Sequence, residues 1–260
     1  STSTPSLLPT TGATVLSRAL SSLGVRLMFG VVGIPVTELA SAAQASGIRY
    51  VGFRNEQAAG VAAAAAGFLT GVPAALLTVS GPGLVNALAG AGHAAANGWP
   101  LLILSGSSSE SSGGEQQRRT GEFQELDQRR LASPLVKWSG RLERASDASS
   151  LVSAALKAAT RGRPGAVYLD LPSEVIQGSV APGEELPAVS FPLPPVLPSP
   201  AVAVLVEEEQ ATTGGGKSSS SLSESLAAAT ALLRAAVRPL AVIGKGAAYG
   251  RADGSLRSFI

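Results

Sequence analysis

The chain has 260 residues, of which 45% are hydrophobic and 15% are charged. This balance predicts a compact globular protein and argues against a disordered one. The 20 basic and 18 acidic residues nearly cancel to a net charge of +2, so no nucleic-acid partner is expected. The absence of Cys and the presence of a single His, His93, exclude disulfides, thiolate chemistry and a His-based metal site. Any nucleophile is therefore expected to come from a cofactor.

Helix-like and strand-like segments alternate from Thr11 to about Gly178. Helices are expected over residues 13–23, 36–45, 56–69, 84–96 and 148–159, and strands over residues 25–32, 48–53, 74–79, 101–104 and 166–171. The strands are continuously apolar rather than alternating, which is typical of parallel strands covered on both faces. The sequence therefore predicts an α/β fold for residues 1–178, with an open parallel sheet and helices on both faces.

The apolar stretch over residues 58–79 does not predict a membrane span. Gly67, Thr70, Gly71 and Pro73 interrupt it, and a helix, a turn and a buried strand explain it better. The N-terminal residues lack the basic and apolar regions of a secretory signal. We therefore expect no association with a membrane.

Proline-dense and Gly/Ser-rich tracts predict a linker or low-complexity insertion over residues 179–221. A helix over residues 222–236, a strand over residues 240–243 and a Gly-Lys-Gly turn then indicate the start of a second α/β domain over residues 222–260. The pattern stops within the next expected helix, so we expect this second domain to be truncated.

Candidate ligand-binding residues lie in the turns after the expected strands, because ligands of open parallel sheets bind outside the carboxyl ends of the strands. The three turns are Gly33-Ile34-Pro35, Arg54-Asn55-Glu56-Gln57 and Ser80-Gly81-Pro82-Gly83. In the third turn, proline fits the first turn of a helix, and the glycines allow a backbone or a planar ligand to approach closely. Its spacing departs from G-x-G-x-x-G at Asn86, so it gives little support for a dinucleotide site.

Glu56 is the candidate for acid–base chemistry. It opens a helix directly after a strand, with Asn55 as the expected N-cap. The free amides of the helix start favour its anion, whereas apolar neighbours such as Ala58 and Val61 disfavour a charge. A carboxylate under two opposed influences is suited to sharing a proton. The alternative, which the spacing leaves open, is that Glu56 only caps its own helix.

Two other polar features have structural explanations. His93 lies among the small residues of an expected helix, where a lone histidine is more often structural than catalytic. Four arginines form a cluster that indicates a solvated face rather than an anion site: Arg118, Arg119, Arg129 and Arg130.

Five motifs, in this order, resemble a known family. They are GVVGIPVT at 30–37, RNEQA at 54–58, VSGPG at 79–83, GEFQELDQ at 121–128, and GRPG at 162–165 with YLDLP at 168–172. Together they resemble the N-terminal, pyrimidine-binding domain of the thiamine-diphosphate-dependent 2-hydroxyacyl-CoA lyases and oxalyl-CoA decarboxylases. The resemblance runs from about residue 11 to 178 and resumes over 238–250, where the central domain of the family begins.

The resemblance implies thiamine diphosphate as the cofactor and a role for each matching residue. Glu56 would hydrogen-bond the aminopyrimidine ring and promote the imino tautomer that deprotonates the thiazolium C2, so that the ylid is the nucleophile. Gln124, beside Phe123, would reach the substrate across a dimer interface and share the catalytic role. The cofactor-binding residues besides Glu56 would be Ile34, Pro35, Ser80, Gly81 and Pro82.

The implied activity is cleavage of the C1–C2 bond of a 2-hydroxyacyl-CoA to formyl-CoA and an aldehyde, as in fatty acid α-oxidation. The pair Phe123-Gln124 favours this lyase activity over oxalyl-CoA decarboxylase, which in oxalate-degrading bacteria has Tyr-Glu at this place. A truncated, non-catalytic paralogue that retains the fold is the alternative from another functional class. The implied partners are an acyl-CoA substrate and further copies of the chain in a homodimer or homotetramer, in the peroxisome or the cytoplasm.

The Gly-Asp-Gly signature, which with a downstream Asn holds Mg²⁺ and the diphosphate in this superfamily, is absent from the sequence. We therefore expect Mg²⁺ to be bound through a missing C-terminal domain. The 260 residues are accordingly expected to be inactive alone.

Overall fold

The computed structural model describes residues 10–108, 121, 123–180 and 222–259. The chain divides into two compact units, Ser1–Val196 and Leu197–Ile260. The predicted linker lies outside the described residues except for 179 and 180, and so do Arg118 and Arg119.

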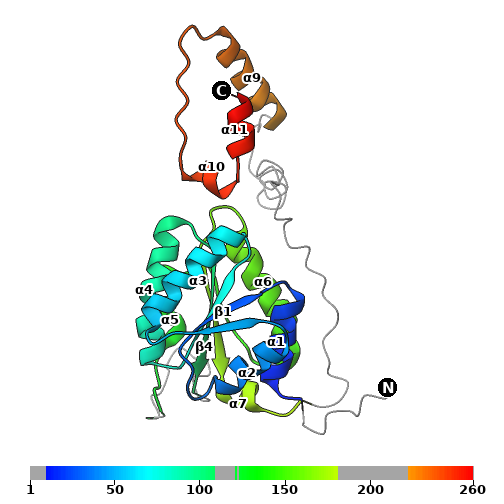
Figure 1. Cartoon of the computed structure of the whole chain (residues 1–260), viewed down its shortest axis with the longest axis vertical. Coiled ribbons are helices and arrows are strands. Elements are labelled where there is room, and N and C mark those ends of the chain that lie inside the picture. Colours follow the sequence, from blue (N-terminus) through cyan, green and yellow to red (C-terminus); the bar gives the residue numbers. More distant parts are fainter. Residues whose placement is uncertain (1–9, 109–120, 122, 181–221, 260) are drawn as a thin grey trace, which may run out of the picture. The chain divides into compact units, whose positions relative to one another are not determined.

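A six-stranded sheet forms the centre of the first unit (Figure 1). Its strands follow the order β2-β1-β3-β4-β6-β5, and every neighbouring pair is parallel. The bounds are β1 Leu27–Gly30, β2 Arg49–Gly52, β3 Ala74–Thr78, β4 Leu101–Ser107, β5 Ser139–Arg141 and β6 Ala166–Pro172. Strands β3, β4 and β6 are buried along their whole length, which explains why their sequences are continuously apolar.

Helices cover both faces of this sheet (Figure 1). Alternate residues of the central strands enter two separate cores: Leu102 and Leu104 pack in one, and Leu101 and Ile103 in the other. The first core includes residues of α1 (Gly12–Ser22), α2 (Thr37–Ala45), α6 (Ala148–Thr160) and α7 (Ser173–Gln177). The second includes residues of α3 (Glu56–Thr70), α4 (Pro82–Asn97) and α5 (Gln128–Ala132). The predicted open parallel sheet with helices on both faces is confirmed.

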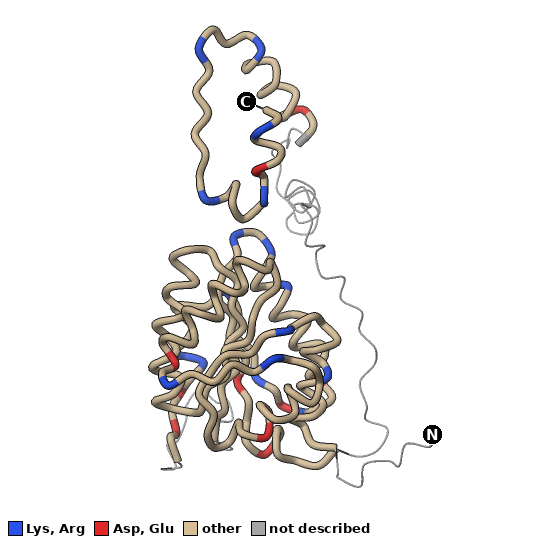
Figure 2. Tube along the Cα trace, in the orientation of Figure 1, with Lys and Arg blue, Asp and Glu red and all other residues tan. Residues whose placement is uncertain are grey.

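Helices α3 and α4 pack with their backbones close together. A Cβ atom built on Gly90 would lie 2.6 Å from the Cα atom of Gly60, so neither position has room for a side chain. This contact explains the run of small residues in both helices. Helix α4 also carries no Lys, Arg, Asp or Glu, and it lies within residues 57–108, which contain none of these residue types (Figure 2).

The second unit contains α9 (Leu222–Ala235), α10 (Lys245–Tyr249) and α11 (Asp253–Phe259). The predicted strand over residues 240–243 is wrong, because this segment is irregular. Leu240 and Val242 are exposed, at 86% and 88%, and the described part of this unit holds no strand with which the segment could pair. No helix in the described ranges combines the length and the apolar character needed to cross a membrane.

Candidate active site

The predicted site residues gather at the carboxyl edge of the sheet. Strands β2, β1 and β3 are neighbours and run parallel, so the turns that follow them leave from the same edge. The turn after β1 carries Ile34 and Pro35, the turn after β2 leads into Glu56, and the turn after β3 carries residues 80–82. Their placement at a shared edge is therefore as the sequence predicts.

Glu56 is the first residue of α3, but the capping hydrogen bond comes from its neighbour. The side chain of Asn55 accepts a hydrogen bond of 3.0 Å from the backbone N–H of Ala58. The half-buried Glu56 carboxylate instead accepts a hydrogen bond of 3.2 Å at Oε2 from Nδ2 of Asn86 in α4. The contact with Asn86 orients the carboxylate toward the neighbouring helix rather than toward its own backbone.

Gly83 keeps the space beside this carboxylate free of a side chain. A Cβ atom at this position would lie 3.7 Å from Oε1 of Glu56 and 2.5 Å from Cγ2 of Val79. The glycine thus allows the first turn of α4 to pack against Val79 and places no side chain against the second carboxylate oxygen of Glu56.

The turn after β3 depends on Gly81. Its φ of 57° lies in the left-handed region that favours glycine. A Cβ atom would also lie 2.7 Å from the backbone oxygen of Gln124. Pro82 then begins α4 and is exposed, whereas Ser80 is buried.

Gln124 lies against this turn although 44 residues separate it from Ser80. The Ser80 hydroxyl donates a hydrogen bond of 3.3 Å to Oε1 of Gln124. Gln124 itself has a positive φ of 56°, and its neighbour Phe123 is 68% exposed. The structure therefore brings both predicted catalytic residues, Glu56 and Gln124, to the carboxyl edge.

Ile34 and Pro35 differ in their surroundings. The Ile34 side chain is 71% exposed, whereas Pro35 is buried against Gly106 of β4. A Cβ atom on Gly106 would lie only 2.7 Å from Cδ of Pro35. Close packing of Pro35 against β4 thus holds this turn and presents Ile34 at the edge of the sheet.

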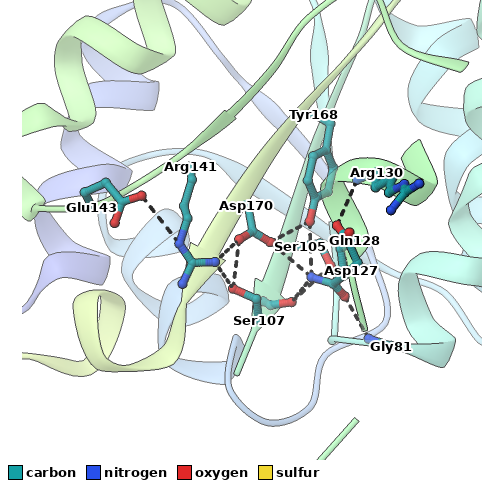
Figure 3. A network of polar contacts seen from close by, with 11 residues as sticks. Gly81, Ser105, Ser107, Asp127, Gln128, Arg130, Arg141, Glu143, Tyr168 and Asp170 are labelled. Carbon is teal, nitrogen blue, oxygen red and sulfur yellow. Dashed lines mark hydrogen bonds and ion pairs between the residues drawn. The ribbon is translucent and has the colours of Figure 1, made fainter. Parts of the chain in front are cut away.

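A buried polar network contacts the turn after β3 at Gly81 (Figure 3). Its centre is Gln128, the first residue of α5, whose side chain is almost fully buried. Oε1 of Gln128 accepts a hydrogen bond of 2.8 Å from the backbone N–H of Gly81. Nε2 donates toward the backbone oxygen of Gly106 at 2.8 Å and toward Tyr168 Oη and Asp170 Oδ1, both at 3.1 Å.

Asp170 forms the charged end of this network. Its Oδ1 accepts a hydrogen bond of 2.7 Å from the Tyr168 hydroxyl, and its Oδ2 accepts one of 3.1 Å from Ser107. Arg141 of β5 forms an ion pair with Oδ2 of Asp170, and both side chains are buried. Burial raises the pKa of Tyr168 well above its usual 10.0, and the negative charge of Asp170 and their hydrogen bond raise it further. Tyr168 therefore stays a neutral donor at physiological pH.

Gln128, Tyr168 and Asp170 lie within the motifs GEFQELDQ and YLDLP, but the sequence predicts no role for them. The available signal was a tyrosine and an aspartate two residues apart in the otherwise apolar strand β6, because buried polar residues require partners. Arg141 lies on a short strand with no apolar pattern, so nothing in its surroundings pointed to a buried ion pair.

His93 takes part in an aromatic contact. Its ring meets the ring of Trp99 edge-on, with centroids 5.1 Å apart, and Trp99 stacks on Phe68. These contacts agree with a structural role. Arg129 and Arg130 are exposed, as expected for a solvated face.

The carboxyl edge carries the half-buried Glu56 carboxylate, backbone groups of glycine-bearing turns and the exposed side chains of Ile34 and Phe123. These groups fit an uncharged, flat heteroaromatic ring that needs hydrogen bonds at its edge. Within the ranges that the structure describes, no group of three or more His, Cys, Asp or Glu residues could hold a metal ion. The described residues therefore fit such a ring but supply no metal centre.

Comparisons with known proteins point to one family. Residues 10–131 match the family model described as "Thiamine pyrophosphate enzyme, N-terminal TPP binding domain". The chain is 46% identical to 2-hydroxyacyl-CoA lyase of Oryza sativa subsp. japonica over 98% of its own length and 41% of the relative. It is 41% identical to oxalyl-CoA decarboxylase of Escherichia coli (strain K12) over 96% of its length and 40% of the relative. It is 37% identical to 2-hydroxyacyl-CoA lyase 1 of Homo sapiens over 96% of its own length and 38% of the relative. The chain thus spans about two fifths of the length of these relatives.

Proposed function

Because this chain belongs to the thiamine pyrophosphate enzymes, we propose that it supplies the pyrimidine-binding part of a 2-hydroxyacyl-CoA lyase. The reaction would cleave the C1–C2 bond of a 2-hydroxyacyl-CoA to formyl-CoA and an aldehyde. The observation that carries this proposal is the placement of Glu56, half-buried at the carboxyl edge and relieved of the capping role by Asn55. When bound, thiamine diphosphate supplies the carbon nucleophile that this chain lacks among its own side chains.

In this proposal, each residue at the carboxyl edge has a separate role in binding the cofactor or the substrate. Glu56 would exchange a proton with a ring nitrogen of the pyrimidine, and the hydrogen bond from Asn86 would hold one of its oxygens in place. The turns with Ile34, Pro35 and residues 80–82 would flank the ring. Gln124 would present its side-chain amide to the substrate from its position beside Ser80.

Oxalyl-CoA decarboxylase is the second candidate, supported by the 41% identity to the bacterial enzyme. The residue pair Phe123-Gln124 supports the lyase, as does the 46% identity to the rice enzyme. In either case the substrate would be an acyl-CoA. We further propose that Mg²⁺ and the diphosphate are held by residues other than those described, since these supply no metal-binding group.

The α3–α4 pair supports a second subunit as partner. Leu69 is 72% exposed and Val85 49% exposed, Pro82 and Ala89 are also exposed, and α4 has no charged side chain. Exposed apolar side chains on two helices that carry almost no charge favour burial against protein, in a homodimer or homotetramer. The compartment that the family resemblance implies is the peroxisome or the cytoplasm.

Product analysis distinguishes the two candidate reactions. The native protein would be incubated with thiamine diphosphate, Mg²⁺ and either a 2-hydroxyacyl-CoA or oxalyl-CoA. Formyl-CoA with an equimolar aldehyde from the first substrate supports the lyase. If oxalyl-CoA gives formyl-CoA and CO₂, and the hydroxyacyl substrate gives no aldehyde, the protein is an oxalyl-CoA decarboxylase and the proposed lyase activity is wrong. If neither substrate gives a product, both activities are contradicted and the non-catalytic alternative is supported.

A further inference from the structure

We infer that Gln128 is a positioning residue, whose buried amide fixes the segments of the proposed site relative to one another. This role rests on the proposed function of the carboxyl edge. The side-chain amide of Gln128 has no hydrogen bond with Glu56 or Gln124 and acts through the segments that it connects. Gln128 connects three segments that are far apart in the sequence: the turn at Gly81, the end of β4 at Gly106, and the segment that carries Gln124.

The first link runs through the backbone of the turns. Gln128 Oε1 accepts from the N–H of Gly81, and Nε2 donates to the oxygen of Gly106, each at 2.8 Å. Gly106 in turn packs against Pro35, with no room for a side chain between them. A single side chain therefore connects the turn after β3 with the end of β4, against which the turn after β1 packs.

The second link runs through the chain itself. Gln128 begins α5 only four positions after Gln124, so its anchorage under the sheet edge limits where Gln124 can lie. Gln124 is held at its other side by the hydroxyl of Ser80 and by close contact with Gly81. The segment with the proposed substrate-facing amide is thus fixed from both ends.

Asp170 determines which way the Gln128 amide points. A carboxylate only accepts hydrogen bonds, so Nε2 must face Asp170 and Oε1 must face the N–H of Gly81. The neutral Tyr168 hydroxyl and the Arg141 guanidinium satisfy the remaining carboxylate positions. Because each of these side chains is buried, a reversed amide would leave unpaired groups.

The test uses the native protein with thiamine diphosphate and Mg²⁺. Gln128→Met removes the amide at similar volume. Gln128→Glu keeps an acceptor for Gly81 but places a second carboxylate against Asp170. Gln177→Glu, at the exposed end of α7, is the control for added charge.

Two quantities are measured, the amide hydrogen exchange of residues 79–83 and 123–127 and the steady-state kinetics. In Gln128→Met, exchange is expected to accelerate in these two segments above any change elsewhere in the domain. The kcat is expected to fall by about tenfold to a hundredfold, the usual scale for a displaced site, with a smaller change in KM. Gln128→Glu should show the same pattern, because it also loses the donor to Gly106 and Asp170.

An unchanged kcat, or exchange that rises equally throughout the domain, would show that Gln128 only stabilises the core. If Gln128→Met does not fold, Gln128→Glu takes its place, and exchange that rises equally throughout the domain in that variant overturns the inference. A wild-type protein without turnover counts against the proposed function alone, and the exchange comparison then decides the role of Gln128.

Discussion

At the start of α3, two adjacent polar side chains have separate partners. Asn55 bonds the backbone of its own helix, and Glu56 bonds Asn86 of the neighbouring helix. Removing the Glu56 charge should therefore leave the helix cap intact, because the capping oxygen belongs to Asn55. This separation allows the chemical role of Glu56 to be tested without unfolding the helix start.

In the native protein, Glu56→Gln is expected to slow exchange of the C2 proton of bound thiamine diphosphate far more than it weakens cofactor binding. An amide keeps the shape and the bond with Asn86 but cannot share the proton. General acid–base groups contribute about 10²–10⁴-fold, which sets the expected fall in turnover. Glu38→Gln, at the exposed start of α2, is the matched control and should leave the exchange rate unchanged. Equal exchange rates for Glu56→Gln and wild type would reduce Glu56 to a structural residue.

Tyr168 makes the stability of the first unit sensitive to alkaline pH. Its pKa in the folded protein is raised above 10.0 by burial and by Asp170, so the unfolded chain loses this proton first as the pH rises. The protonated Tyr168 hydroxyl contributes fully to the free energy of unfolding below about pH 10, its pKa in the unfolded chain. This contribution declines as the pH rises from that value to the higher pKa of the folded protein. Thermal melts from pH 8 to 11 should therefore show a smaller alkaline decline for Tyr168→Phe than for wild type. An equal decline in both proteins would contradict this assignment.

The pair of helices α3 and α4 depends on glycine at their crossing. Gly90→Ala is expected to destabilise the protein by about 1–3 kcal/mol, because the new methyl group would overlap the backbone of Gly60. Gly92→Ala in the same helix is the control, since a Cβ there meets nothing within 4 Å. That variant should gain up to about 1 kcal/mol from helix propensity. Denaturant unfolding measures both changes, and equal effects would mean that the crossing tolerates a side chain.

Strands with a strong apolar pattern could be predicted from the sequence, whereas strands that depend on pairing with a neighbouring strand could not. Strand β3, Ala74–Thr78, was expected over 74–79 because its residues are continuously apolar. Strand β5 was missed because Ser139–Arg141 gains its pairing only from β6. The segment over 240–243 was assigned as a strand on hydrophobicity alone, but pairing requires a neighbour.

The same distinction holds for the candidate site. Glu56 and the glycine-bearing turns could be located because each follows a predicted strand. The contact of Gln128 with Asp170 could not, because 42 residues separate the two and it depends on the register of β6 beside β4. In the sequence, Asn86 is only a departure from a glycine motif, because its bond to Glu56 depends on the packing of α3 against α4.

For the molecule as a whole, a polypeptide of these 260 residues is expected to bind thiamine diphosphate weakly or not at all, and to show no turnover. The described residues contain no cluster of three or more His, Cys, Asp or Glu that could hold a metal ion, and proteins usually bind Mg²⁺ through carboxylates together with phosphate oxygens. Isothermal titration with and without Mg²⁺ measures this, with the native protein as the reference. Tight, Mg²⁺-dependent binding to the 260 residues would contradict the expectation.

The strand order also explains why the site lies where it does. From β1 the chain passes through α2 to β2 on one side, and from β3 it passes through α4 to β4 on the other. Because α2 and α4 pack in different cores, the connections from the adjacent strands β1 and β3 diverge to opposite faces of the sheet. Such a topological switch point, the place where the winding of the chain reverses, is where open parallel sheets bind ligands. Substitutions in the two diverging loops could therefore change which ring is accepted while both cores remain intact.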